Sequence, residues 1–456
     1  MTAAVALKPQ TGPIEAYVEQ YGALRRVLPG ANLPWLASLR DAAIARFQTQ
    51  GFPTTKLEAW KFTNLARLTA QSFAPAEICP INLASSQIAH ARLAGMCELL
   101  MVFVNGRFRA DLSDPQLEDD NALPAGVRIL SFAEALRDRP AQVESHIAEP
   151  DADAAQALAN LNMALAADGA VIHLARGAKL AQPLHLLFLT LPDGETPASH
   201  LRNLIIAEEG AEVTVVESYA ALGTGAYWSN GVTQVSAASG ATVRHFKRQG
   251  ESMDGFHTSL SDVTLQEDAR YESFVLATGG NLARHEVRAR LLGDRAAATL
   301  NGAYLGRGHQ HQAQRTDLEH RAVGTTLSEL YKGVFDERSH GAFLGRIHVA
   351  EDAQKTDAQQ QNRNLLLSDG AVADTKPELE INADDVKCAH GATVGDLDRE
   401  PLFYLRARGI GEVDARALLI QAFICELIDS IKDEPVRAYF RNAFAHWLEE
   451  EGINPP

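Results

Sequence analysis

A repeated pattern of short β-like segments between residues 170 and 390 constrains the fold of this chain most strongly. Turn signals recur at Gly210-Ala211, Gly240-Ala241 and Asp268-Ala269, which are 30 and 28 residues apart. Strand-like runs occur about every 14 residues, with no helical insert between them. Because a single coil of this size cannot bury its apolar face, successive coils must stack to form a core. The pattern favours a parallel β-helix, and a β-sandwich stays open as the alternative.

The sequence before this region has helical spacing and few strand signals. Apolar residues at helical intervals follow Pro34, and Gly51 ends the run, which predicts a helix between these two positions. A strand pair is expected where Leu99–Val104 is followed by the turn Asn105-Gly106. Aromatic and charged residues mix at 56–63, where we expect a packed surface helix rather than a contact with nucleic acid.

Helical periodicity returns after the β region. One apolar stripe predicts a first helix, and a second helix is expected to begin near Asp433-Glu434-Pro435, where acidic residues and proline suit a first turn. These helices could cap the open end of the solenoid or present a surface to a partner. The stripes contain Ile420, Phe423, Ile424, Leu427, Ile428 and Ile431, then Val436, Tyr439, Phe440, Phe444, Trp447 and Leu448.

We therefore predict a mainly β protein with three domains. A mostly helical domain spans residues 1–165, a parallel β-helix spans 166–390, and a helical domain spans 391–456.

The composition argues against several classes of protein. The hydrophobic content of 46% and charged content of 22% are typical of a soluble globular chain. A net charge of -16 argues against nucleic acid or an anionic membrane as the main partner. No run approaches the roughly 18 apolar residues of a membrane helix, and the N-terminus lacks the pattern of a secretory signal. The four cysteines form no CxxC pair or disulfide framework, so we expect a reducing cytoplasm.

Most familiar catalytic motifs are absent. The sequence contains no GxxxxGK[ST] phosphate loop, so no ATP site of its own is expected, and it contains no GxSxG or HExxH. This absence argues against a classical enzyme. His309 and His311, with His320 further on, could be metal ligands because alternation on a strand places the first two on one face. Surface or interface histidines are the favoured interpretation of this group.

A cysteine and a histidine two residues apart, Cys388 and His390, are the strongest candidates for chemistry. On an extended strand they point to the same face, about 6.6 Å apart. Both residue types bind iron or zinc, but two ligands do not complete a metal site. The remaining ligands would come from elsewhere in the chain or from another chain. The structural alternative is a buried cysteine beside a hydrogen-bonded histidine.

The sequence between Tyr331 and Ile410 resembles the SufB/SufD family of iron-sulfur cluster assembly proteins. Within this family the chain is more similar to the SufD type, because no cysteine lies between Cys97 and Cys388 and because the 56–61 block is SufD-like. The matching blocks, in order, are Tyr331–Val334, Ala353–Ala358, Asn364–Ser368, Asp374–Ile381, Ala383–Thr393 and Leu402–Ile410.

The resemblance implies a right-handed parallel β-helix flanked by helical domains, in a complex with SufB and two copies of the ATPase SufC. It implies that His390 faces SufB near a transient, shared iron-sulfur cluster, with Cys388 beside it. It also implies that SufC docks on the C-terminal helices, between about Asp396 and Ile431. The candidate contacts on that surface are Leu402, Phe403, Arg406, Phe423 and Leu427.

These observations predict a non-catalytic, cytoplasmic scaffold subunit of the SufBCD complex that has neither nucleic-acid binding nor membrane insertion. Two alternatives stay open: a purely structural adaptor for SufC, and a metal-dependent or carbohydrate-active β-helix enzyme. A homodimer of the isolated chain also stays open.

Overall fold

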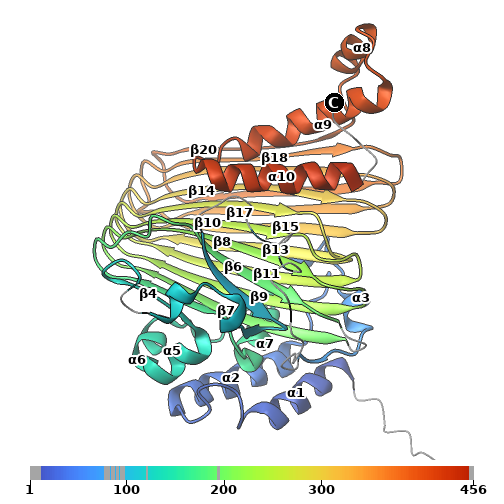
Figure 1. The fold of residues 1–456 in the computed structure, drawn as a ribbon. Helices are drawn as coiled ribbons and strands as arrows, with labels where there is room; N and C mark the ends of the chain where they lie inside the picture. Colours follow the sequence, from blue (N-terminus) through green and yellow to red (C-terminus); the bar gives the residue numbers. More distant parts are fainter. Residues whose placement is uncertain are drawn as a thin grey trace, which may run out of the picture.

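The computed structural model describes residues 12–76, 83, 88, 92, 98–119, 122–192 and 196–450. Cys79 and Cys97 lie outside these residues, as does the segment 1–11, for which no secretory signal is expected. The described part is a β-solenoid of about 8 turns with helices on its outer faces (Figure 1). The parallel β-helix expected from the repeat is therefore confirmed, and the β-sandwich is excluded.

Two ten-stranded sheets form the solenoid, and from β5 onward the chain crosses from one to the other at every strand. From β5 onward, each strand pairs in parallel with the strand two positions along, except at the last two strands. Sheet A contains β5 (Ala170–Leu174), β7 (Pro197–Ala207), β9 (Tyr227–Ala237), β11 (Gly255–Leu265), β13 (Leu282–Leu291), β15 (His311–His320), β17 (His340–Val349) and β19 (Val372–Ile381). Sheet B contains β6 (Leu184–Thr190), β8 (Glu212–Ala221), β10 (Thr242–Gln249), β12 (Arg270–Ala277), β14 (Ala297–Gly306), β16 (Thr326–Phe335), β18 (Asp357–Leu366) and β20 (Lys387–Gly395).

The predicted turn signals occupy the same corner of successive coils. Gly210, Gly240 and Asp268 have positive φ angles of 67°, 69° and 56°. Each of their backbone N–H groups donates to the corner of the next coil, at 2.9, 2.8 and 2.9 Å respectively. Glycine suits this left-handed conformation because it has no Cβ, and aspartate tolerates it better than most residues. The repeat in the sequence therefore reflects a backbone conformation with positive φ that recurs at the same corner of each coil.

The start of the solenoid is closed by antiparallel strands from the N-terminal region. In sheet B, β2 (Leu99–Val104) pairs with β6 and then turns back into β3 (Arg107–Phe108) through Asn105 and Gly106, both with positive φ. In sheet A, β4 (Val127–Ser131) pairs antiparallel with β5. The predicted strand pair is confirmed, and it belongs to the solenoid.

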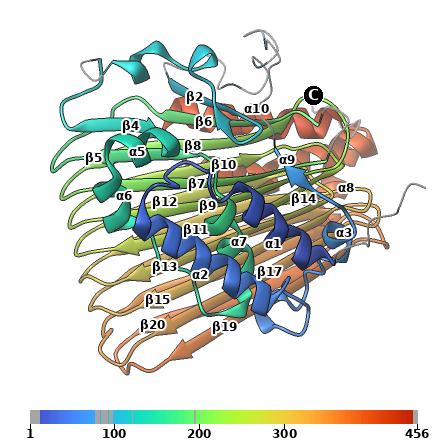
Figure 2. The same ribbon diagram turned by 90° about the horizontal axis from the view of Figure 1, so that it is seen from below.

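The N-terminal helices cover the outer face of sheet A (Figure 2). The predicted helix is α2, which begins at Pro34 and ends at Gly51 in a left-handed conformation. Its apolar side packs with α7 and with residues on β7, β9, β11 and β13, including Trp228 and Phe256. The helices are α1 (Pro13–Leu24), α2 (Pro34–Gln50), α3 (Ala66–Thr69), α5 (Phe132–Asp138), α6 (Pro140–His146) and α7 (Ala157–Leu165).

The prediction of a surface helix at 56–63 is wrong. Only Glu58–Trp60 forms a short 3-10 turn. Trp60 is buried, and the Arg284 guanidinium stacks 3.9 Å from its ring centre. Thr63 is fully buried beside the same arginine. These contacts with the solenoid replace the helical hydrogen bonds that the local sequence favours.

The helices that follow β20 are α8 (Arg399–Ala407), α9 (Glu412–Ile428) and α10 (Glu434–Glu450). Of these, α9 and α10 lie along the outer face of sheet B, whereas α8 projects away from it (Figure 1). The stripes of α9 and α10 pack on Val216, Phe246, Phe274 and Leu305 of sheet B. The expectation that these helices could cap the end of the solenoid is therefore wrong. Lys332 of β16 helps to hold α9, since its buried ammonium donates to the Phe423 carbonyl at 2.7 Å.

We predict that Phe440→Ala destabilises the chain by about 3–5 kcal/mol, because the ring is fully buried and packs edge-on against Phe246 and Phe274. Phe403→Ala is the matched control, since Phe403 is 74% exposed and its loss should change stability by less than about 0.5 kcal/mol. Denaturant unfolding of both variants checks the prediction. Equal effects would show that α10 does not pack on sheet B as described.

Candidate functional site

The last coil of the solenoid ends in two strand edges, β19 and β20. Neither edge pairs with a further strand among the described residues. Almost every residue of β20 is exposed, whereas alternate residues of β18 and most residues of β16 are buried. An exposed edge with free N–H and C=O groups is a template for pairing with another chain.

Cys388 and His390 lie on this edge strand and face the solenoid interior. Cys388 is in register with Ala358, and His390 is in register with Gln360, both of which are buried inside the preceding coil. The two side chains share one face, as strand alternation predicted. Cys388 is half-buried against the core, while His390 is exposed because no coil follows it.

The chemistry of the pair is incomplete within this chain. Burial raises the pKa of the Cys388 thiol, and the charge of Asp357 raises it further, so the thiol holds its proton at neutral pH. Among the described residues, no group of three His, Cys, Asp or Glu side chains could hold a metal ion. Cys388 and His390 are only two ligands, so they can bind a metal ion strongly only if other residues, outside the described ones or on another chain, supply further ligands.

A buried polar column lies directly behind His390. Gln360 donates from Nε2 to Glu329 on the preceding coil at 2.9 Å, and the three residues follow one another in register. Gly345 faces this column, and a side chain there would collide with the Gln360 amide. Burial raises the pKa of Glu329 to about 7. One oxygen of Glu329 and the Gln360 carbonyl oxygen have no hydrogen-bond partner in the described part of the chain.

Sequence reasoning missed this column. The run 359–364 is rich in amide side chains, and alternate members of it point inward: Gln360, Asn362 and Asn364. The contact between Gln360 and Glu329 joins residues 31 positions apart. The alternation of side chains along a strand indicates which of these amides point inward. Only the register between the two strands shows that Glu329 is the partner of Gln360.

A second buried polar cluster lies deeper in the solenoid, around Glu217. His245 and Lys247 contact its carboxylate at 2.9 and 3.2 Å, and Thr233 donates to it at 2.5 Å. Although burial alone would raise the pKa of Glu217, the charges of Lys247 and His245 hold it well below its ordinary value. This carboxylate is satisfied by its own chain and stabilises the interior.

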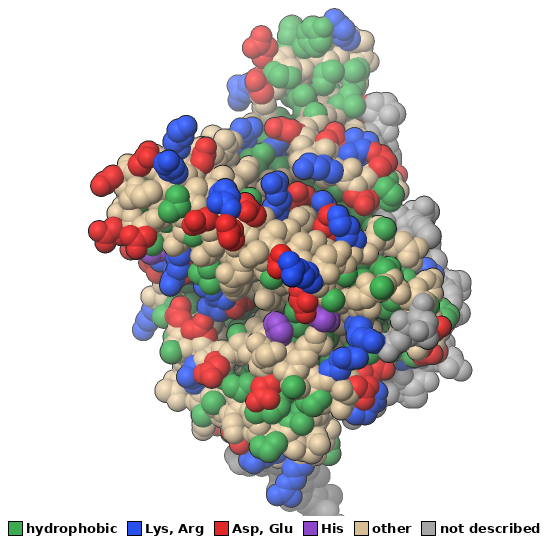
Figure 3. Space-filling view, turned by 90° about the vertical axis from the view of Figure 1, so that its left-hand side faces the viewer, with side chains coloured by type: hydrophobic (Ala, Val, Ile, Leu, Met, Phe, Trp, Pro, Cys, Tyr) green, Lys and Arg blue, Asp and Glu red, His purple; other side chains and the backbone are tan. Residues whose placement is uncertain are grey.

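The candidate partner contacts fall into two groups. Leu402, Phe403 and Arg406 lie on α8, which projects from the body of the protein and carries exposed hydrophobic side chains at its tip (Figures 1 and 3). Phe403 is 74% exposed. Phe423 is half-buried over Lys332, and Leu427 is 1% exposed within the packing of α9 on sheet B. The α8 residues are therefore accessible, whereas Leu427 is part of the core.

The three histidines considered as metal ligands do not form one site. His309 and His311 lie near each other on the outside of sheet A, where His311 contacts His340. His320 is buried and bonds Thr325 at 2.8 Å.

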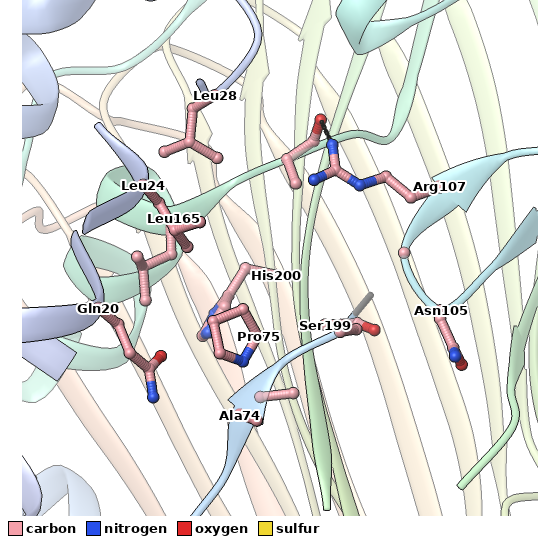
Figure 4. Close-up of a pocket in the computed structure, with 14 residues that line it drawn as sticks. Gln20, Leu24, Leu28, Ala74, Pro75, Asn105, Arg107, Leu165, Ser199 and His200 are labelled. Carbon is pink, nitrogen blue, oxygen red and sulfur yellow. Dashed lines mark hydrogen bonds between the residues drawn. The ribbon is translucent and has the colours of Figure 1, made fainter. Parts of the chain in front are cut away.

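A separate hollow of about 460 Å³ lies between α1 and the β2–β3 turn, at the opposite end of sheet A from β19 (Figure 4). Arg107 in its wall already donates to the Ala167 carbonyl at 3.1 Å. Burial lowers the pKa of His200 to about 3, and Asn230 contacts its Nδ1 at 3.1 Å. The buried imidazole of His200 is therefore neutral, and the guanidinium of Arg107 is already hydrogen-bonded. These two side chains do not form a set of catalytic residues.

The fold and the incomplete half-site define a β-solenoid protein that carries potential ligands at an unpaired end. Two family models match the chain: the SUF system FeS cluster assembly SufBD core domain over residues 190–423, and the SufBD protein N-terminal region over residues 12–186. The chain belongs to the SufB/SufD family of the SUF iron-sulfur cluster assembly system.

Several relatives match over most of both chains. The iron-sulfur cluster assembly protein SufD of Escherichia coli is 34% identical over 85% of this chain and 87% of its own length. An iron-sulfur cluster assembly SufBD family protein of Synechocystis is 32% identical over 87% of each chain. The SufD protein of Bacillus subtilis is 25% identical over 88% of this chain and 92% of its own length. Among the described helices, none is long and apolar enough to span a membrane.

We predict that Glu329→Gln stabilises the chain at pH 8 and has little effect at pH 5. In the folded chain Glu329 keeps its proton up to about pH 7, whereas the unfolded chain releases it near 4.5. Between about pH 4.5 and pH 7, Glu329 therefore takes up a proton when the chain folds. As a result, the free energy of unfolding falls as the pH rises through this range. The neutral amide removes this penalty, which is about 1–3 kcal/mol. Unfolding at both pH values tests this, and equal shifts would contradict it.

Proposed function

We propose that this chain is a non-catalytic, cytoplasmic scaffold subunit of a SufBCD-type complex, in which a SufB-type partner pairs with its open end. The observation that carries this proposal is the position of Cys388 and His390. They lie on the inner face of the last coil, at an edge that no strand in the described part of the chain covers. A half-site at an unpaired edge is suited to completion by a second chain.

Strand pairing explains how the partner would complete the site. A strand added to β20 would lie about 4.8 Å away, and its inward side chains would face the same interior space as His390. A thiolate or carboxylate from that strand would then supply the missing ligands of a nascent iron-sulfur cluster. Such a cluster is held by several thiolate or imidazole groups together. The cluster is the cargo of this site, transient and shared by both chains.

His390 and Cys388 would have different roles at the shared site. The exposed imidazole of His390 offers a nitrogen without movement of the backbone. The Cys388 thiol is half-buried and its pKa is raised, so it becomes a ligand only when a nearby cation or metal lowers this pKa and the proton passes to water. His390 is therefore the principal ligand or proton-handling residue of this chain, and Cys388 is secondary.

The α8 projection is the proposed docking site for the ATPase SufC. Its exposed Phe403 and Tyr404 form an apolar surface, flanked by Arg406 and Arg408. Exposed aromatic and arginine side chains are the residue types that dominate protein interfaces. ATP hydrolysis belongs to that partner, which accords with the missing phosphate loop in this chain. A purely structural adaptor for SufC is the second candidate, favoured by the accessibility of α8.

We predict that His390→Ala lowers bound iron and sulfide by about tenfold or more when the chain is co-expressed with SufB and SufC partners and purified anaerobically. The complex should assemble normally, because His390 makes no hydrogen bond within the described chain. His348→Ala is the matched control, since His348 lies near the same end but faces outward on β17, beside Glu380. An unchanged cluster content in His390→Ala would exclude the shared site and leave the adaptor function.

We predict that Phe403→Asp weakens SufC binding by about 30-fold without changing the unfolding midpoint, because its side chain is exposed in the isolated chain. Leu427→Asp serves as the comparison, since a charge at this buried position should unfold the packing of α9. Binding is measured by calorimetry and folding by circular dichroism. A Phe403→Asp chain that binds SufC with unchanged affinity would place docking elsewhere.

A further inference from the structure

A basic hollow on the outer face of sheet A is separate from the His390 site. Its volume is about 350 Å³, and it lies between the segment 55–67 and the start of β15 and β17. Three cationic side chains and three histidines face it, with a single carboxylate. These residues are Lys61, Arg67, Arg338, His309, His311, His340 and Asp374.

The three cations lack close carboxylate partners within the described residues. Arg67 donates only to neutral oxygens, the Asn281 side chain at 3.3 Å and the His309 carbonyl at 2.8 Å. Lys61 reaches Glu58 only at 4.0 Å, and that carboxylate already bonds Lys376.

Arg338 has no ion pair among the described residues. Other arginines of the chain are closely paired: Arg295 contacts both Glu267 and Asp268, and Arg288 contacts two aspartates. In a protein with a net charge of -16, three cations left uncompensated around one hollow create a local positive potential.

The one carboxylate of the hollow is engaged by a histidine pair. His340 Nε2 lies 2.8 Å from Asp374, which can only accept, so this nitrogen carries a proton. In the neutral ring, Nδ1 of His340 then accepts from Nδ1 of His311 across 3.2 Å. His311 Nε2 in turn accepts from the Thr63 hydroxyl at 3.1 Å. Asp374 is therefore turned toward His340, and none of the cations reaches it within ion-pair distance.

His311 cannot add charge to this arrangement under ordinary conditions. Its burial, together with the charges of the neighbouring His340 and Arg284, lowers its pKa to about 3. The fixed positive charges around the hollow are therefore those of Lys61, Arg67 and Arg338.

We propose that this hollow binds a small oxyanion of the phosphate or carboxylate class. Arg67 and Arg338 would supply planar guanidinium donors, and Lys61 a compact positive charge, which is the usual recognition chemistry for such groups. The volume leaves room for a molecule larger than a single phosphate ion. The occupant would link the N-terminal segment to β15 and β17, so it would also fasten this segment to the solenoid.

Calorimetry of the full-length chain at constant ionic strength tests the proposal. Inorganic phosphate, pyrophosphate and citrate are titrated separately, so that phosphoryl and carboxylate ligands are distinguished. We expect saturable binding of at least one of them. The double variant R67Q/R338Q should lower its affinity by about tenfold or more, because two charge-assisted hydrogen bonds are lost. Arg26→Gln, at an exposed arginine that does not line the hollow, should leave the affinity unchanged.

The single variant Arg338→Gln is a control in case the double variant misfolds. We expect it to fold normally, since the Arg338 side chain forms no ion pair in the described structure. It should weaken binding measurably while the unfolding midpoint stays constant. Failure of all three ligands to bind would overturn the proposal. Equal loss in Arg338→Gln and Arg26→Gln would also overturn it, by showing binding to general surface charge. The result does not depend on whether His390 contributes to a cluster.

Discussion

Parallel hydrogen bonding between strands one coil apart is the interaction on which the rest of the structure depends. It stacks each position directly over its equivalent in the next coil, so that side chains form columns along the solenoid axis. One column runs through Val213, Val243, Tyr271, Ala298, Leu327 and Ala358 and ends at Cys388. The adjacent column ends at His390. The site is thus the exposed end of two columns that are buried everywhere else in the solenoid.

The sequence was sufficient for the features that depend on local geometry. The corner residues Gly210, Gly240 and Asp268 revealed the coil length, because each must adopt a positive φ. Pro34 and Gly51 bounded α2 for similar local reasons. The shared face of Cys388 and His390 followed from strand alternation alone. In each case the information lies within a few residues of the position that it determines.

Features that depend on distant contacts could not be predicted in the same way. The stripe containing Leu427 indicated burial, but amphipathicity does not say which surface a helix will cover, and that surface is the side of sheet B. Trp60 lies in a short 3-10 turn, where it stacks with Arg284, a residue more than 200 positions later in the chain. The Glu329–Gln360 contact likewise needs the register of two coils. Such pairings exist only once the solenoid has formed.

The two ends of the solenoid differ, and this difference limits how the protein can assemble. At one end the short antiparallel strands β3 and β4 terminate both sheets, while at the other no described strand pairs with the outer edges of β19 and β20. A solenoid with long free edges at both ends could add copies of itself without limit and grow into a fibre. Here the strand edges of ten and nine residues belong to β19 and β20, whereas β3 and β4 have only two and five residues. Two chains that joined through their long edges would therefore leave only short edges for any further copy.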